Sequence, residues 1–307
     1  MLYGKKIKDP GLGYNSRSDA QSIIRKNGAS NIKHINKKFN VNDVYTYFVE
    51  LSWGTFFLIV FLSYIIMNVL FGYLYTVIGI SQITPSKGNF YDDFLSGFFF
   101  SAQTLTTVGY GGISPKGVAA NFIAAFEAML GLLSFSFITG LLYGRFSKPK
   151  AAIHFSENII LRNLNNKRTL MFRIMNSRKT VMIEPEVTVT LAITKEDEAH
   201  KFSRNYYRFS LEREKIMYLP TTWTIVHEIN EASPLFEYTN EEIGALDAEL
   251  YILVKYHEES FGQQVYQISS YDFSKLIIGK KYKPSFYYDD EGYTVLDHDR
   301  LNEMELM

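Results

Sequence analysis

Two long apolar stretches constrain the fold of this chain more than any other feature. Residues 53–77 form a run of about 25 without a charge, and residues 118–146 form a run of about 29 whose one charge before Arg145 is Glu127. Each run is long enough to cross a lipid bilayer as a tilted helix. The sequence therefore predicts a membrane protein with two spans.

Composition narrows the remaining choices. The 307 residues leave room for two or three domains, and the chain has no cysteine and a net charge of zero. A disulfide framework and a zinc–thiolate site are both excluded. No apolar run precedes residue 50, so we expect no cleavable signal peptide. We also expect no enzymatic activity, no organic cofactor and no nucleic-acid partner.

The segment between the spans predicts a pore structure. Residues 92–104 are too few to cross a bilayer, and Asp92 and Asp93 favour a helix start there. A loop rich in glycine, residues 106–111, follows directly. Non-helical backbone at membrane depth is tolerated only when it is buried in protein or lines water. We therefore predict a short pore helix followed by a loop that lines a pore.

This loop resembles the selectivity filter of potassium channels. Residues 107–111 read Thr-Val-Gly-Tyr-Gly and match the filter at all five positions: Thr107, Val108, Gly109, Tyr110 and Gly111. Glycine reaches the backbone conformations that such a ribbon needs. The resemblance implies that four copies surround one axis and that the carbonyls of residues 107–110 replace the water around K⁺. A chance turn on a soluble surface is the alternative, which the flanking spans disfavour.

The polar segment before the first span is basic. Residues 1–50 contain nine Lys or Arg and four acids, and residues 1–40 are predicted to be a mostly extended cytoplasmic arm. Residues 41–51 carry apolar side chains at helical spacing, which indicates a slide helix along the membrane interface. The alternative is that residues 41–51 form the first turns of the first span. Residues 52–150 are predicted to form a transmembrane pore domain. Because the segments before Trp53 and after Phe146 are rich in Lys and Arg, we expect both termini in the cytoplasm.

The second span carries two candidate functional residues and ends in a basic cluster. A carboxylate within a span is a functional candidate, and for Glu127 we favour hydrogen bonds that support the filter over direct contact with ions. Gly131 permits either a hinge or close packing. Anionic lipid headgroups should be drawn to Arg145, Lys148 and Lys150.

The remainder predicts an all-β domain of immunoglobulin-like type. Runs rich in β-branched and aromatic residues occur at 169–174, 186–193, 223–229 and 249–256, separated by polar clusters. We interpret residues 151–296 as a cytoplasmic β-sandwich with a regulatory role. The acidic tail, residues 297–307, is expected to fray.

Taken together, the chain resembles the prokaryotic branch of the inward-rectifier potassium channels. The filter, residues 145–150 (RFSKPK), residues 223–229 (WTIVHEI) and residues 233–235 (SPL) carry the resemblance. It implies a homotetramer in the bacterial inner membrane, regulated by anionic lipid, with a cytoplasmic vestibule that extends the pore.

Several residue roles follow from this resemblance. Tyr143 matches the aromatic gate of the inner helices, with a lipid-facing tyrosine as the alternative. Phe135 stands where strongly rectifying members carry an acid, which implies weak voltage-dependent block. Glu258 and Glu259, expected in a turn between strands, match the acidic ring of the vestibule, although an ordinary solvated surface is nearly as good an interpretation.

The sequence also departs from the family pattern. Gln103 and Ile113 occupy positions where many members pair a glutamate with an arginine, so the filter must be braced by neutral hydrogen bonds. Two rival functions remain. One is a pore subunit of a cation uptake system that works with a nucleotide-binding partner, and the other is a membrane-anchored scaffold with a silent pore.

Overall fold

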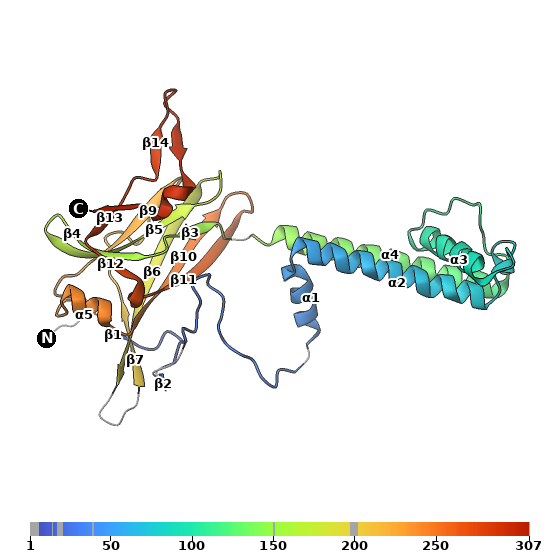
Figure 1. Ribbon diagram of the computed structural model, residues 1–307, viewed down its shortest axis with the longest axis horizontal. Helices are drawn as coiled ribbons and strands as arrows, with labels where there is room; N and C mark the ends of the chain where they lie inside the picture. The colour runs from blue at the N-terminus through green and yellow to red at the C-terminus, as the bar shows by residue number, and fades with distance from the viewer. Residues whose placement is uncertain are drawn as a thin grey trace. The chain divides into compact units, whose positions relative to one another are not determined.

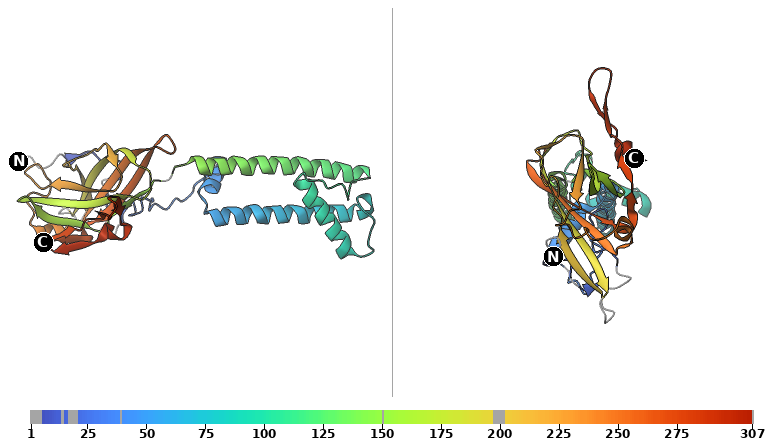
Figure 2. Two further views of the ribbon diagram at one scale, coloured as in Figure 1. Left: turned by 90° about the horizontal axis from the view of Figure 1, so that it is seen from above. Right: turned by 90° about the vertical axis from the view of Figure 1, so that its left-hand side faces the viewer.

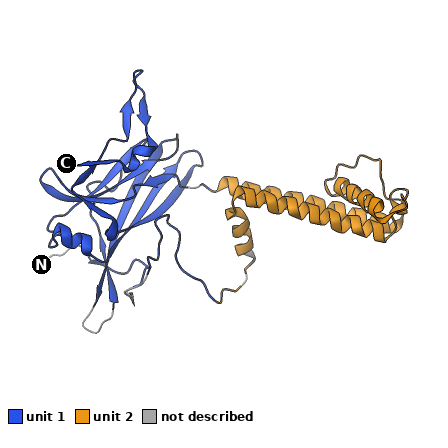
Figure 3. Cartoon of the chain, viewed as in Figure 1, with its two compact units in different colours: residues 1–35, 149–307 blue, residues 36–148 orange. Residues whose placement is uncertain are grey.

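The chain forms two compact units, each of which is described by itself. The computed structural model describes residues 6–13, 15–16, 21–38, 40–149, 151–196 and 202–306. One unit contains residues 36–148, and the other contains residues 1–35 and 149–307 (Figure 3). We call them the membrane unit and the β unit. Lys150, one of the predicted lipid contacts, lies outside the described residues.

The membrane unit is helical. Its elements are α1 (Val41–Glu50), α2 (Trp53–Val77), the 3₁₀ turn η1 (Ile80–Gln82), α3 (Phe90–Leu105) and α4 (Val118–Ser147). Among the described residues, α2 and α4 are the two helices that are long and apolar enough to cross a membrane. The prediction of two spans with a short helix between them is therefore confirmed.

The two spans run antiparallel, and α3 packs against both of them near the end of the unit that is remote from α1 (Figure 2). Close contact between α2 and α3 depends on two glycines. A Cβ atom at Gly72 would lie 2.9 Å from the backbone of Phe98, and a Cβ atom at Gly97 would lie 2.7 Å from the carbonyl oxygen of Gly72. Larger side chains at either position would force these helices apart.

Helix starts follow from local capping. The Ser52 hydroxyl accepts a hydrogen bond from the Thr55 amide at 3.2 Å and caps α2. The Asn89 side chain accepts from the Asp92 amide at 2.8 Å and caps α3. Between α2 and α3, Ile80 and Ile83 are buried, because these two side chains join the apolar cluster around α2, α3 and α4.

The β unit contains two main sheets. One has the strand order β1-β7-β6-β10-β11, and the other has the order β12-β4-β5-β3 with β9 paired to β5 (Figure 1). Their strands are β1 (Lys6–Ile7), β2 (Asn15–Ser16), β3 (Ile153–Phe155), β4 (Ile159–Leu164), β5 (Lys167–Asn176), β6 (Met182–Glu196), β7 (Phe202–Arg208), β8 (Tyr218–Leu219), β9 (Thr222–Glu228), β10 (Ala248–Glu258), β11 (Gln263–Asp272) and β12 (Leu276–Ile278).

The two sheets share one core. Alternating residues of β6 and β10, such as Leu191 and Ile252, are fully buried in a cluster with Ile174 and Ile225 from the other sheet. This alternation is what a sheet packed on one face requires. The four predicted runs overlap β5, β6, β9 and β10, so the mostly-β domain is confirmed. A short helix, α5 (Asn240–Ala245), begins with a capping box between Thr239 and Glu242.

The N-terminal arm packs on the β unit instead of extending freely. Its strands β1 and β2 both pair with β7. The Asp9 carboxylate accepts from the amides of residues 11–13 at 2.7–2.9 Å, and the Tyr206 hydroxyl donates to the Gly13 carbonyl at 2.6 Å. Further along, the Ser270 hydroxyl donates to the Ile24 carbonyl at 2.8 Å. Backbone hydrogen bonds thus hold the arm to the sheet.

The C-terminal tail is ordered, so the expectation of fraying is wrong for residues 298–306. The turn η3 (His298–Asn302) buries Leu301, and β16 (Met304–Leu306) pairs with β13 (Lys280–Tyr282). A hairpin of β14 (Phe286–Tyr288) and β15 (Thr294–Leu296) projects from the same unit (Figures 1 and 2).

Candidate functional site

The predicted filter segment has an alternating backbone. Thr107, Gly109 and Gly111 have φ angles of +59°, +53° and +80°, whereas Val108 and Tyr110 between them are not in the left-handed region. Threonine rarely adopts this conformation, so Thr107 marks strain that the surrounding structure must hold in place. Alternation between the two hands turns successive carbonyl groups toward a common side.

The end of α3 holds the start of this segment. The Gln103 carbonyl accepts from the amides of Val108 at 2.9 Å and Gly109 at 3.3 Å, and the Thr104 carbonyl accepts from the Thr107 amide at 3.0 Å. These bonds satisfy carbonyl groups that a helix end otherwise leaves unpaired. The contact of Gln103 is made by its backbone, and the supporting role predicted for its side chain stays a prediction.

The backbone conformation, and not a lack of space for a side chain, explains why Gly109 and Gly111 are glycines. Within the described residues, a Cβ atom built at Gly109 or Gly111 would meet nothing within 4 Å. Both residues nevertheless have positive φ angles, which alanine adopts at a cost of about 1–2 kcal/mol. The glycines are therefore required by the turn of the backbone.

A buried polar network joins α2, α3 and α4. The Tyr75 hydroxyl of α2 donates to the Glu127 carboxylate of α4 at 2.7 Å. The Ser101 hydroxyl of α3 contacts both the Glu127 carboxylate and the side-chain amide oxygen (Oδ1) of Asn68, the latter at 2.9 Å. Asn68, Ser101 and Glu127 are fully buried. Sequence reasoning identified Glu127 but missed its partners, whose signal was a polar side chain within an apolar helix.

Gly131 lies where α4 meets the end of α3. A Cβ atom there would overlap the carbonyl oxygen of Leu105. This contact is the close packing that the sequence left open beside a hinge; bending at Gly131 stays a prediction.

The basic end of α4 contacts α1. Arg145 donates to the backbone carbonyls of Phe48, Val49 and Leu51. The Lys148 ammonium pairs with the Glu50 carboxylate at 2.8 Å. Lipid contact by these two residues stays a prediction. Farther up α4, the predicted gate residue Tyr143 and the apolar Phe135 are both exposed in the single chain.

The two predicted vestibule acids differ in environment. Glu258 is the last residue of β10 and not part of the turn. It is buried, with its carboxylate 3.6 Å from the Arg178 guanidinium and 3.3 Å from the Thr180 hydroxyl. Glu259, in the turn that follows, is exposed. Of the pair, Glu259 alone presents its charge to solvent.

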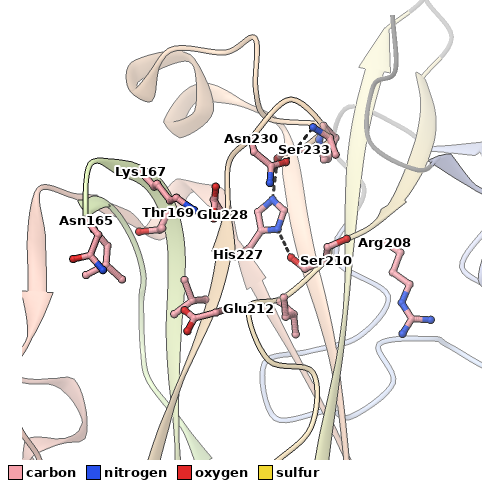
Figure 4. A pocket seen from close by; sticks show the side chains of 15 residues that line it. Asn165, Lys167, Thr169, Arg208, Ser210, Glu212, His227, Glu228, Asn230 and Ser233 are labelled. Atoms are coloured by element: carbon pink, nitrogen blue, oxygen red, sulfur yellow. Dashed lines mark hydrogen bonds and ion pairs between the residues drawn. The ribbon is translucent and has the colours of Figure 1, made fainter.

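A polar pocket in the β unit surrounds His227 (Figure 4). Its Nδ1 lies 2.8 Å from the Ser210 carbonyl and its Nε2 lies 2.8 Å from the Ser233 hydroxyl. A carbonyl only accepts, so Nδ1 carries the hydrogen and Ser233 donates to Nε2. Burial lowers the pKa of His227, which favours this neutral form. The side chain fastens the loop after β9 and is not arranged for catalysis.

None of the described residues form a cluster of three or more His, Asp or Glu side chains that would hold a metal ion. Backbone carbonyls, and not only such side chains, can hold a dehydrated K⁺. The structure thus brings together α3, residues 107–111 at its carboxyl end, and the polar network that joins α3 to both spans.

Comparison with known proteins identifies both units. A profile described as the inward rectifier potassium channel transmembrane domain matches residues 24–149, and one described as the inward rectifier potassium channel C-terminal domain matches residues 153–307. The inward rectifier potassium channel Kirbac3.1 of Paramagnetospirillum magnetotacticum is 29% identical over 92% of this chain and 95% of its own length.

Eukaryotic relatives match less closely. Human inward rectifier potassium channel 18 is 26% identical over 89% of this chain and 68% of its own length. A solved structure, Pseudomonas fluorescens alkylpurine DNA glycosylase AlkC bound to DNA, aligns over 62% of this chain and 48% of its own at a TM-score of 0.20 and 10% identity, too low to indicate a shared fold. The two profiles span both units, and this chain therefore belongs to the inward rectifier potassium channel family, whose members are membrane-embedded ion channels and not enzymes.

Proposed function

We propose that this potassium channel is a homotetramer whose selectivity filter is residues 107–111. One observation carries the proposal: the backbone alternates in hand at Thr107, Gly109 and Gly111, and the end of α3 anchors it through Gln103. One chain supplies a single such ribbon. Four ribbons around an axis are needed to enclose an ion with carbonyl oxygens.

Conduction in this proposal is passive. K⁺ exchanges its water for the carbonyls of residues 107–110 and moves on by repulsion from the next ion. The carboxyl end of α3 contributes partial negative charge near the filter, which favours cations there. The network of Asn68, Ser101, Tyr75 and Glu127 supports the filter from behind by fixing α3 between the two spans.

We assign the gate to Tyr143 on α4. We also propose that the protein lies in the bacterial inner membrane with both termini in the cytoplasm. Tyr143 is exposed in the single chain, which is consistent with a side chain that meets its copies at the pore axis. Phe135 offers no charge to blocking cations, so strong voltage-dependent block is not expected. Glu259 adds negative charge to a cytoplasmic vestibule, and anionic lipid biases the gate.

Flux into liposomes that contain only this protein tests the proposal. A potassium gradient should drive uptake that barium blocks and that sodium does not replace. Both rival functions predict silence, because a pore that needs a nucleotide-binding partner and a scaffold cannot conduct alone.

A closed gate would also be silent, so a second variant separates the two. Tyr143→Ala should raise basal flux in a correctly assembled tetramer. If flux is absent in every lipid mixture and in Tyr143→Ala, the channel proposal is wrong.

A further inference from the structure

The predicted filter segment is anchored at its start by the Gln103 carbonyl, and its far end needs a support of its own. Residues 112–117, which we call the return segment, lead from Gly111 to the start of α4. Gly111 and Gly112 are neighbouring glycines, and glycine has more conformational freedom than any other residue. The shape of this end must therefore be set by contacts with other parts of the membrane unit.

The 3₁₀ turn η1 and the residue after it supply these contacts. Ile80 and Ile83 are buried in the apolar cluster around α2, α3 and α4, and Ile113 of the return segment packs against the same cluster. Three residues further along, the Lys116 amide donates to the Gln82 carbonyl at 2.7 Å. An apolar contact and a backbone hydrogen bond thus attach the return segment to the membrane unit.

The side chain of Gln82 is itself held in place. Its Nε2 donates to the carbonyl of Ile78, the C-cap residue of α2, at 2.7 Å. The last carbonyls of a helix have no partner within the helix, so this bond satisfies one of them. It also fixes the half-buried Gln82 side chain against the end of α2.

Gly117, at the end of the return segment, fits against this fixed side chain. A Cβ atom at Gly117 would overlap Oε1 of Gln82 and would lie 2.9 Å from its Cδ and 3.1 Å from its Cγ. The φ angle of Gly117 is −92°, which other residues also adopt. Lack of space, and not the backbone conformation, therefore requires glycine here.

We propose that Gln82 is a positioning residue for the far end of the filter segment, because its backbone and its side chain together fasten the return segment to the end of α2. The carbonyls of residues 107–110 face a common axis only while both ends of the segment are held, so potassium binding depends on this contact. The effect on ions rests on the proposed function, whereas the contact itself does not.

A double-mutant cycle tests the contact. Gly117→Ala should force the Gln82 side chain away from the Ile78 carbonyl, and Gln82→Ala removes that side chain. Each variant should raise the hydrogen exchange of the Lys116 amide about fivefold in nanodiscs that hold the full-length protein. The double variant should exchange no faster than either single one, because Gln82→Ala leaves room for the new methyl group.

Potassium binding separates positioning from general stability. Calorimetric titration of the sodium form of the assembled protein with K⁺ gives the dissociation constant, which Gln82→Ala should raise about fivefold. A merely structural contact would lower the thermal midpoint of the protein and leave this constant unchanged. Ser81→Ala is the matched control, since Ser81 is the exposed middle residue of η1, and it should alter neither exchange nor binding.

A milder variant covers poor assembly. Gln82→Met keeps the length of the side chain and removes only the donor to the Ile78 carbonyl. It should raise the exchange of the Lys116 amide and the potassium dissociation constant about threefold each.

Multiplied exchange rates in the double variant would overturn the contact between Gln82 and Gly117. Faster exchange with an unchanged potassium dissociation constant would overturn the positioning role. If the unmodified protein binds no K⁺ at all, the proposed function is contradicted, and the exchange measurements still judge the contact.

Discussion

The membrane unit and the β unit place their apolar side chains in opposite ways. In the β unit, Leu191 and Ile252 are fully buried between two sheets, whereas in the membrane unit Phe61 and Phe135 are 60% and 70% exposed. Burial drives the folding of the first unit. The second leaves much of its apolar surface exposed in the single chain, so its internal arrangement must be specified by other contacts.

Those other contacts are close approaches of helices at glycines and hydrogen bonds between buried polar side chains. Gly72 and Gly97 let α2 and α3 approach, and the network around Glu127 fixes α3 against both spans. In the β unit, buried polar side chains instead fasten loops to strands. Arg173, for example, donates to the Lys283 carbonyl at 2.7 Å. The same kind of group thus orders helices in one unit and connections in the other.

The largest effect should come from the backbone of the filter. Gly109→Ala places a Cβ atom on a residue with φ of +53°, whereas Gly112→Ala changes a neighbouring glycine without a positive φ and without close contacts among the described residues. The first variant should lose its preference for potassium over sodium in bilayer recordings, because the alternating conformation is lost. The second should keep it. Retained selectivity in Gly109→Ala would contradict the filter assignment.

Matched leucines test the contrast between the units. Leu191→Ala should reduce the stability of the β unit by about 2–5 kcal/mol, because it leaves a cavity in a packed core. Leu58 of α2 is 55% exposed, and Leu58→Ala should cost less than about 1 kcal/mol. Denaturation followed by Trp223 fluorescence measures the first, and thermal dissociation in detergent measures the second. Equal losses would remove the contrast.

Removing the acceptor of the polar network should have a smaller effect. Glu127→Ala leaves the hydroxyls of Tyr75 and Ser101 without that partner, at a cost of about 1–3 kcal/mol. Ser136→Ala is the control, since the one hydrogen bond of its hydroxyl among the described residues is to the Leu132 carbonyl of its own helix. Thermal dissociation of the assembled protein compares the two. An unaffected Glu127→Ala protein would show that the network does not hold α3.

The smallest effect concerns pH. Burial lowers the pKa of His227, so the unfolded chain takes up a proton that the folded side chain resists. Its contribution to stability is present above the unfolded pKa and is lost as the pH falls toward the folded one. Stability measured by Trp223 fluorescence should therefore fall as the pH drops below about 6.5, the ordinary pKa of histidine. The loss should shrink in His227→Gln and persist in His257→Gln, which replaces an exposed histidine; the reverse result would assign it elsewhere.

Sequence patterns predicted the elements that depend on local periodicity. The uncharged run gave α2 its ends at Trp53 and Val77, and alternation located strands such as β6 and β10. The Thr-Val-Gly-Tyr-Gly motif also predicted backbone conformations that glycine reaches at Gly109 and Gly111, and both residues have positive φ angles.

Contacts between residues far apart in the sequence could not be predicted from sequence patterns. Asn68 and Ser101 are ordinary polar residues until the helices bring them to Glu127. Arg145 donates to backbone carbonyls at the end of α1. Because every residue has a backbone carbonyl, no pattern of side chains could predict this contact. The acidic composition of the tail predicted fraying, and it gave no sign that Leu301 is buried or that β16 pairs with β13.

The location of permeant ions tests the account most directly. Crystals of the assembled protein grown with Tl⁺, which scatters anomalously and substitutes for K⁺, should show peaks on an axis between the carbonyls of Thr107, Val108, Gly109 and Tyr110. The peaks should disappear in Gly109→Ala and remain in Gly112→Ala. Tl⁺ bound elsewhere, with none beside these carbonyls, would contradict the assignment of residues 107–111 as the filter.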